Sequence, residues 1–156
     1  MAIKQECFEV EEKVVDSILI ASIRYKKKYC DCGQAFGKIC RKMGRLASGK
    51  PFKLYYDAEY KEDNADIESC IDISKPKESE GIYIRTLEGG KFLSLIHQDS
   101  YDDIGRSYEK IIAYANEKDC STSVPSREIY IKGPGMLFKE NPKKYLTEIQ
   151  MIIDDE

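Results

Sequence analysis

The chain has 156 residues, of which 42% are hydrophobic, and its 25 basic and 28 acidic residues give a formal net charge of -3. This length predicts one domain, residues 1–156, with one good-sized core. The small net charge excludes a strong global attraction to nucleic acid or to an anionic membrane. We interpret the one dense basic run, residues 26–28, as a solvated strand end.

No segment approaches the roughly 20 apolar residues of a membrane span, and the first residues, MAIKQECFEVEE, lack the order of a secretion signal. We therefore expect a cytoplasmic protein. The six cysteines fit this expectation, since Cys7, Cys40 and Cys70 fall inside apolar patterns. Cys30 and Cys32 have no second Cys or His pair to complete a metal site, so we predict no metal and no cofactor.

The first half of the chain predicts a strand, a helix and two more strands. Residues 18–25 are rich in Ile, as buried strands are. Apolar residues recur at helical spacing from Phe36 to Ala47, and Gly49-Lys50-Pro51 then ends the helical stretch. Two further strands are expected at residues 53–57 and 65–73.

The second half predicts the same order of elements. The turn Glu88-Gly89-Gly90 indicates a hairpin before a strand at 92–97. Helical spacing returns from Ile104 to Ala115. Strands at residues 127–132 and 145–153 complete the series.

The similarity of the two halves indicates an internal repeat. Ser22 and Ser94 are 72 residues apart, as are the pairs Tyr29/Tyr101, Gly33/Gly105 and Ile39/Ile111. Pro51 and Pro125 are 74 apart, and Glu68 and Glu148 are 80 apart; insertions in loops explain the drift.

The repeat predicts an α+β fold made of a duplicated strand-helix-strand-strand unit, at residues of about 5–75 and 80–154. Two helices would lie on an antiparallel sheet. The non-helical faces of two pseudo-symmetric halves would look at one another across a central ligand groove.

Glu128 is a carboxylate in the middle of the predicted strand PSREIYIKGPG. Side chains alternate along a strand, so Glu128 and Tyr130 share one face. Aligning the two prolines makes Leu54 and Tyr56 their counterparts, so we expect these four residues to line the groove. The further candidates are Tyr145, Phe36 and Tyr108.

The predicted chemistry rests on burial of Glu128. A buried carboxylate without a partner has a raised pKa, and an organic cation would restore its charged form. An alternative is that Glu128 is an ordinary exposed residue of an edge strand. Phe36 and Tyr108 at helical spacing are also compatible with a core role. We interpret Glu68 and Glu148 as structural.

Six segments, AFGKI, SYEKI, FKLYYD, ADIESCIDI, REIYIKGP and NPKKYLTEIQMII, together resemble one family over about Phe8 to Ile153. This is the GyrI-like small-molecule-binding domain, or AraC-type effector-binding domain, the ligand-sensing half of multidrug-responsive transcription regulators. The resemblance implies two units related by a pseudo-two-fold axis with a ligand groove between them. It also implies that the glutamate of the REIY-type strand, here Glu128, meets lipophilic, often cationic, aromatic ligands.

Three functions follow from this resemblance. The first is a stand-alone binding protein for lipophilic or cationic aromatic small molecules, because the chain begins almost directly at the first strand. The second is hydrolysis of cyclopropane-containing DNA-alkylating natural products, with Glu128 activating or positioning water and Tyr130 or Tyr56 polarising the substrate carbonyl. Gly135 and Met136 after REIYIKGP depart from the pattern of those members. The third is a DNA gyrase-interacting protein, which a net charge of -3 does not favour.

The expected partners follow from the leading hypothesis. We expect a small-molecule ligand, no direct nucleic acid binding and no membrane association. A partner protein or a homodimer is compatible with the sequence.

Overall fold

The computed structural model describes residues 9–27, 33–57, 64–98, 104–132 and 146–154. These residues form eight strands, two helices and one short 3-10 turn. In chain order they are β1 (Glu11–Val15), β2 (Ile18–Lys27), α1 (Gly33–Met43), η2 (Gly44–Leu46), β3 (Ala47–Tyr55), β4 (Ala65–Ile73), β5 (Tyr83–Leu87), β6 (Gly90–Gln98), α2 (Ile104–Glu117), β7 (Ser121–Lys132) and β8 (Leu146–Asp154). The predicted α+β class is confirmed, and the duplication itself stays a prediction.

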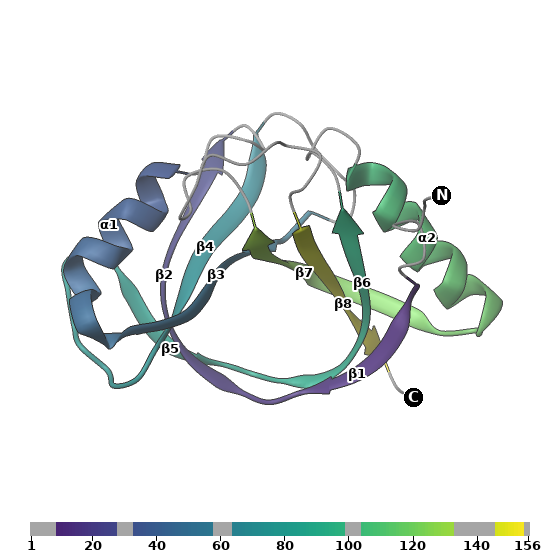
Figure 1. Cartoon of the computed structure of the whole chain (residues 1–156), viewed down its shortest axis with the longest axis horizontal. Helices are drawn as coiled ribbons and strands as arrows, with labels where there is room; N and C mark the ends of the chain where they lie inside the picture. The colour runs from purple at the N-terminus through teal and green to yellow at the C-terminus, as the bar shows by residue number, and fades with distance from the viewer. Residues whose placement is uncertain (1–8, 28–32, 58–63, 99–103, 133–145, 155–156) are drawn as a thin grey trace, which may run out of the picture.

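All eight strands form one antiparallel sheet in the order β1-β6-β8-β7-β3-β4-β2-β5. The strands β3 and β7 lie at its centre. The two helices lie at opposite ends of the molecule, with β3 and β7 between them (Figure 1). Each helix covers one half of the sheet: α1 packs against β2, β3 and β4, and α2 packs against β6, β7 and β8.

The predicted hairpin at residues 88–90 is wrong. Strand β5 pairs with β2, and β1 pairs with β6. Each half of the sheet therefore receives its edge strand from the part of the chain that forms the other half. The two connections approach closely, since the Gly89 amide donates to the Ser17 hydroxyl at 3.1 Å. A Cβ atom on Gly89 would lie only 1.9 Å from the Val15 carbonyl oxygen. Gly89 is therefore needed for this close approach, not for a hairpin turn.

The central strands begin six residues earlier than predicted. Gly49-Lys50-Pro51 lies inside β3, and residues 121–126 belong to β7. The pairing register shifts between Ser48 and Phe52 and again between Ser123 and Arg127. These bulges allow each strand to contain a proline, which cannot donate a ladder hydrogen bond.

One row of directly paired residues defines the face that carries the helices. Across six strands this row consists of Ile23, Ser69, Lys53, Glu128, Ile149 and Leu95. Directly opposed residues point to the same face of a sheet. Leu95 and Ile149 pack with Ile111 of α2, so we call this side the helix face.

The non-helical face has its own smaller core. It consists of Ile20, Phe52, Leu54, Cys70 and Leu87.

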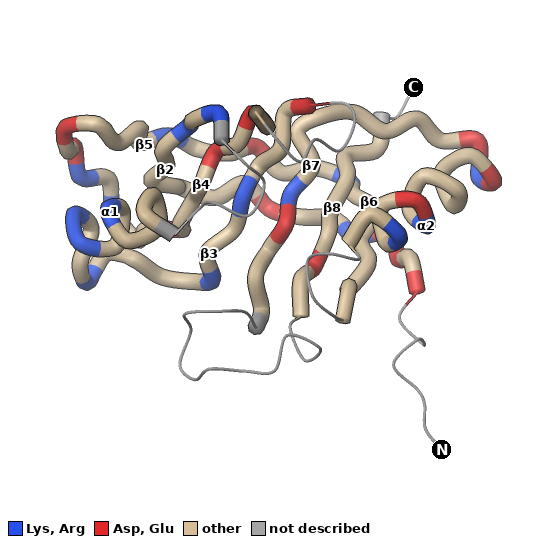
Figure 2. Tube along the Cα trace, turned by 90° about the horizontal axis from the view of Figure 1, so that it is seen from above, with Lys and Arg blue, Asp and Glu red and all other residues tan. Residues whose placement is uncertain are grey.

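Along the trace, Lys and Arg mix with Asp and Glu, and basic residues gather at α1 (Figure 2). None of the helices among the described residues is long and apolar enough to cross a membrane.

Candidate functional site

Glu128 lies on β7 at the centre of the sheet and is fully buried. The Tyr130 hydroxyl donates a hydrogen bond to its Oε1 at 2.8 Å, and the Tyr108 hydroxyl donates to its Oε2. The carboxylate therefore has hydrogen-bond partners, and the expected unpartnered carboxylate is wrong. The alternative of an exposed residue on an edge strand is wrong as well.

Aromatic side chains from both helices and both central strands surround this carboxylate. Phe36 of α1 meets the Tyr130 ring edge to face, with centroids 6.3 Å apart and planes at 74°. The Tyr55 hydroxyl lies 3.4 Å from the Tyr130 hydroxyl. The structure thus brings Phe36, Tyr108 and Tyr130 together around Glu128 as expected, while their contact with a ligand stays a prediction.

A buried lysine completes this site, and the sequence analysis missed it. Lys53 of β3 is directly opposite Glu128 and only 3% exposed. Its Nζ lies 5.4 Å from the Tyr130 ring centroid and 5.9 Å from that of Tyr55. These distances fall within the range of cation-π attraction. The faces of both rings therefore already accept a positive charge.

Leu54 and Tyr56 do not belong to this site. Leu54 pairs with Arg127 and packs in the core of the non-helical face. The prediction used the 74-residue offset of the prolines, whereas the pairing of Lys53 with Glu128 corresponds to an offset of 75. A shift of one residue moves every side chain to the other face. Glu128 itself lies on the helix face, in the row that contains Lys53 and Ile149, so the expectation that it lines a groove between non-helical faces is wrong.

A usable signal was present in the sequence. Lys53-Leu54-Tyr55 and Glu128-Ile129-Tyr130 share the order charged, aliphatic, tyrosine. Aligning these two triplets gives the offset of 75 and would have found Lys53 and Tyr55.

Tyr145, a predicted ligand contact, lies outside the described residues, as do Cys30 and Cys32, for which we predicted no metal site. Within the described ranges, no three His, Cys, Asp or Glu side chains form a group that could hold a metal ion.

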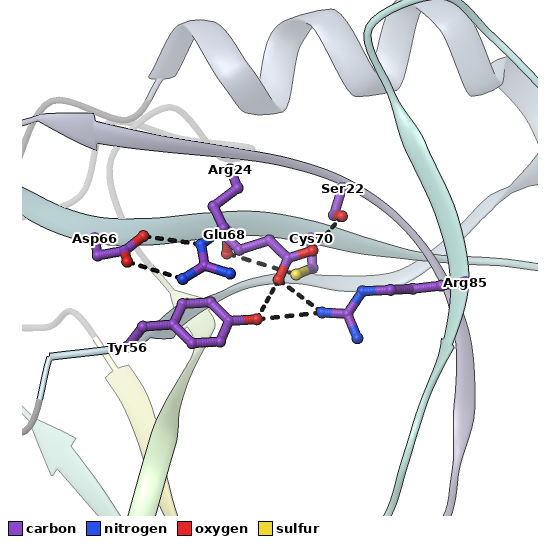
Figure 3. A network of polar contacts seen from close by, with 7 residues as sticks. All are labelled: Ser22, Arg24, Tyr56, Asp66, Glu68, Cys70 and Arg85. Carbon is purple, nitrogen blue, oxygen red and sulfur yellow. Dashed lines mark hydrogen bonds and ion pairs between the residues drawn. The ribbon is translucent and has the colours of Figure 1, made fainter.

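Glu68 of β4 is the centre of a second polar cluster, on the non-helical face (Figure 3). Its carboxylate accepts hydrogen bonds from the Ser22 hydroxyl, from the Tyr56 hydroxyl at 2.5 Å and from Arg85 Nη2 at 2.6 Å. Burial alone would raise the pKa of Glu68, but these three hydrogen bonds outweigh burial and the pKa is lowered. Burial and the bond to Glu68 raise the pKa of the Tyr56 hydroxyl.

Glu148 of β8 has an equivalent set of partners on the same face. Lys13 Nζ donates to its Oε2 at 2.8 Å, the Ser94 hydroxyl at 2.6 Å and Gln150 Nε2 at 3.0 Å. Burial again raises the pKa of Glu148, and the hydrogen bonds from Lys13, Ser94 and Gln150 lower it further than burial raises it. The contacts of Glu68 and Glu148 support the structural interpretation of both residues.

Comparisons with known proteins agree with the overall fold. A family model described as a GyrI-like small molecule binding domain matches residues 41–154. The structure of an EcmrR–DNA complex has a TM-score of 0.81 and 22% identity, and covers 96% of this chain and 58% of the EcmrR chain. The chain thus spans 58% of the EcmrR length. The crystal structure of the EcmrR C-terminal domain gives a TM-score of 0.78 over 96% of this chain and 99% of that one, again at 22% identity.

Two further structures share the fold. A hydrolase from Listeria innocua has a TM-score of 0.72 and 12% identity, over 94% of this chain and 92% of its own. The structure of SAV2435 bound to tetraphenylphosphonium has a TM-score of 0.57 and 17% identity, over 94% of each chain. No curated protein sequence gives a significant match.

Proposed function

Because this chain belongs to the GyrI-like small-molecule-binding domain family, we propose that it captures lipophilic, cationic aromatic compounds at the Glu128 site. One observation carries the proposal: a fully buried carboxylate at the centre of the sheet, held by two tyrosine hydroxyls among aromatic rings. Such a group can balance the charge of an organic cation, and the rings can cover its apolar surface.

The energies are sufficient for useful affinity. A well-placed cation-π contact contributes about 0.5 to 2 kcal/mol. Covering roughly 200 Å² of apolar ligand surface contributes about 5 kcal/mol at about 25 cal/mol per Å². After the entropy of association is subtracted, an affinity near micromolar, about -8 kcal/mol, is reasonable.

Tetraphenylphosphonium is a suitable probe, because it is the lipophilic cation bound in the SAV2435 structure. Isothermal titration calorimetry of the full chain should give saturable binding. Glu128→Gln keeps the shape of the side chain but removes its charge, so we expect at least tenfold weaker binding, about 1.4 kcal/mol. Neutral triphenylphosphine oxide should bind both proteins alike.

Glu148→Gln is the matched control, since it removes a partly buried carboxylate from the opposite face of the sheet. Its affinity for tetraphenylphosphonium should equal that of the wild type. Equal affinities for Glu128→Gln and the wild type would remove Glu128 from the site.

We further propose that the sheet consists of two copies of one unit with the ligand site at their junction. The strand order supports this, because β1-β6-β8-β7 on one side corresponds to β5-β2-β4-β3 on the other. The repeated contacts support it as well: the Ser22 hydroxyl bonds Glu68, and the Ser94 hydroxyl bonds Glu148.

Hydrolysis is a second candidate function. The contact between the Tyr130 hydroxyl and Glu128 Oε1, at 2.8 Å, supports it, because a glutamate can position water and a tyrosine can polarise a carbonyl. Incubation with a cyclopropane-containing alkylating compound should then give the water adduct in mass spectrometry, and Glu128→Gln should abolish it. Formation no faster than in buffer would exclude this reaction for that substrate.

A further inference from the structure

The face opposite Glu128 contains a hollow of about 230 Å³ that the proposed function does not use. It lies between the β1–β2 connection and the central strands β3 and β7. Its walls combine apolar and polar side chains, chiefly Ile18, Phe52, Ile129, Asp72, Arg127 and Gln150. This volume suits a small metabolite.

Arg127 is the exceptional residue of this hollow. It is only 3% exposed, yet among the described residues it has no carboxylate within ion-pair distance. Its Nη2 donates to the Glu88 carbonyl oxygen at 2.7 Å, and its guanidinium lies 4.4 Å from the Phe92 ring centroid. These contacts use one of the five guanidinium N–H donors. Asp72, which also lines the hollow, attracts the guanidinium but makes no ion pair with it, and burial still lowers the pKa of Arg127. An anion bound directly to the guanidinium would stabilise its charged form.

The two other arginines of this face show the contrast. Arg85 and Arg24 are more exposed, and each has a carboxylate partner, at 2.6 and 2.8 Å. Arg24 belongs to the same row of paired residues as Arg127, through Glu68 and Leu54. The two more exposed arginines thus each form an ion pair with a carboxylate, whereas among the described residues the buried Arg127 forms none.

A second buried polar group lines the same hollow. Gln150 is directly opposite Arg127 and only 5% exposed. Its Nε2 donates to Glu148, whereas its Oε1 has no hydrogen-bond partner within the part of the chain that the structure describes. A buried acceptor of this kind calls for a donor. A ligand N–H or O–H group could supply one after a small rotation of the amide.

We propose that this hollow binds a small monocarboxylate with an apolar body, held at its carboxylate by Arg127. The fork of guanidinium N–H groups matches a carboxylate. Phe52 and Ile129 would cover the apolar body. Asp72 and Lys50 also line the hollow, and their opposite charges offset one another. Arg127 then leaves the lining with one net positive charge, which matches a monoanion, whereas a dicarboxylate would have to bury a second carboxylate against Phe52 and Ile129.

Calorimetric titration of the full chain tests this site with 4-methylpentanoate and with leucine, which adds an amino group to the same body. Two control probes differ in charge: succinate is a dianion, and 4-methylpentanol is uncharged. We expect saturable binding of 4-methylpentanoate or leucine, and at least tenfold weaker binding of succinate and the alcohol. The absence of binding of both 4-methylpentanoate and leucine at millimolar concentration would overturn the proposal.

Arg127→Met should lower the affinity at least tenfold, whereas Arg24→Met, on the same row and face, should leave it unchanged. Equal affinity in Arg127→Met and the wild type would overturn the proposal. If circular dichroism shows that Arg127→Met does not fold, Ile18→Trp, which fills the hollow from its rim, should abolish carboxylate binding. Tetraphenylphosphonium binding to the same variants separates this site from the Glu128 site, because only a global defect would change both.

Discussion

Glu68 and Glu148 share one face of the sheet but lie in its two different halves, and each is held by a serine of the neighbouring strand and by a cation of an edge strand. For Glu68 these are Ser22 and Arg85, and for Glu148 they are Ser94 and Lys13. The two central strands differ from each other, because Lys53 of β3 is directly opposite Glu128 of β7 on the helix face. The flanks thus repeat one arrangement of charges, whereas the centre pairs unlike residues. Differences at the centre, not at the flanks, are available to select a ligand.

The two flanking clusters are also unequal in strength. Arg85 contacts both Glu68 and the Tyr56 hydroxyl, at 2.6 and 3.3 Å, while Lys13 contacts Glu148 alone at 2.8 Å. The Glu68 side chain is 4% exposed and that of Glu148 is 13% exposed. Removing Glu68 therefore leaves more buried donors without an acceptor.

Glu68→Ala should show the largest effect on stability. We expect it to lower the free energy of unfolding by about 2 kcal/mol, since Ser22, Tyr56 and Arg85 lose their acceptor. Glu148→Ala should cost about 1 kcal/mol, because Lys13 returns to water easily. Urea unfolding followed by circular dichroism measures both, and equal or reversed losses would contradict the ranking.

Lys53→Met should sharpen the contrast at the centre. Removing the buried Lys53 charge from the Glu128 site should strengthen tetraphenylphosphonium binding about thirtyfold. The Lys53 ammonium and a ligand cation roughly 8 Å apart would repel by about 2 kcal/mol at an effective dielectric constant of about 20. Calorimetry measures the change, with Lys110→Met on the exposed face of α2 as the control. Unchanged or weaker binding by Lys53→Met would show that Lys53 does not compete with the ligand charge.

Acid should produce the smallest effect, because burial opposes the hydrogen bonds at both glutamates. The folded pKa values of Glu68 and Glu148 are lowered from the ordinary value of 4.5. Each therefore stabilises the fold above about pH 4.5, and this contribution is lost as the pH falls through the folded pKa. Unfolding free energies measured between pH 6 and pH 3 should fall less steeply for a Glu68→Gln/Glu148→Gln double variant. An identical slope would assign the acid sensitivity to other groups.

The sequence predicted the helices and the six longer strands because their apolar periodicity is strong. It did not predict the exchange of β1 and β5, since their pairing with β6 and β2 depends on how two connections pack, with Gly89 against Val15. A local turn signal cannot report such a contact.

For the site, the sequence identified Glu128, Tyr130, Tyr108 and Phe36 as candidates that the structure places together. It placed Leu54 and Tyr56 on the same face as Glu128, whereas they lie on the opposite face. The two prolines, which belong to the bulged parts of β3 and β7, are 74 residues apart, but the facing residues Lys53 and Glu128 are 75 apart. Alternation along a strand carries a one-residue error to every following side chain.

The exchange of edge strands gives β1 a protective role on the far side of the sheet. β6 is apolar along much of its length, with the sequence GKFLSLIHQ, and β1 covers its outer edge. β1 itself is short and begins with Glu11, Glu12 and Lys13, the kind of charged edge that discourages pairing with another molecule. Deleting residues 1–15 would remove β1 and leave the apolar β6 as the exposed edge of the sheet. The half of the sheet that contains α2 is therefore protected from edge-to-edge association by five residues from the first part of the chain.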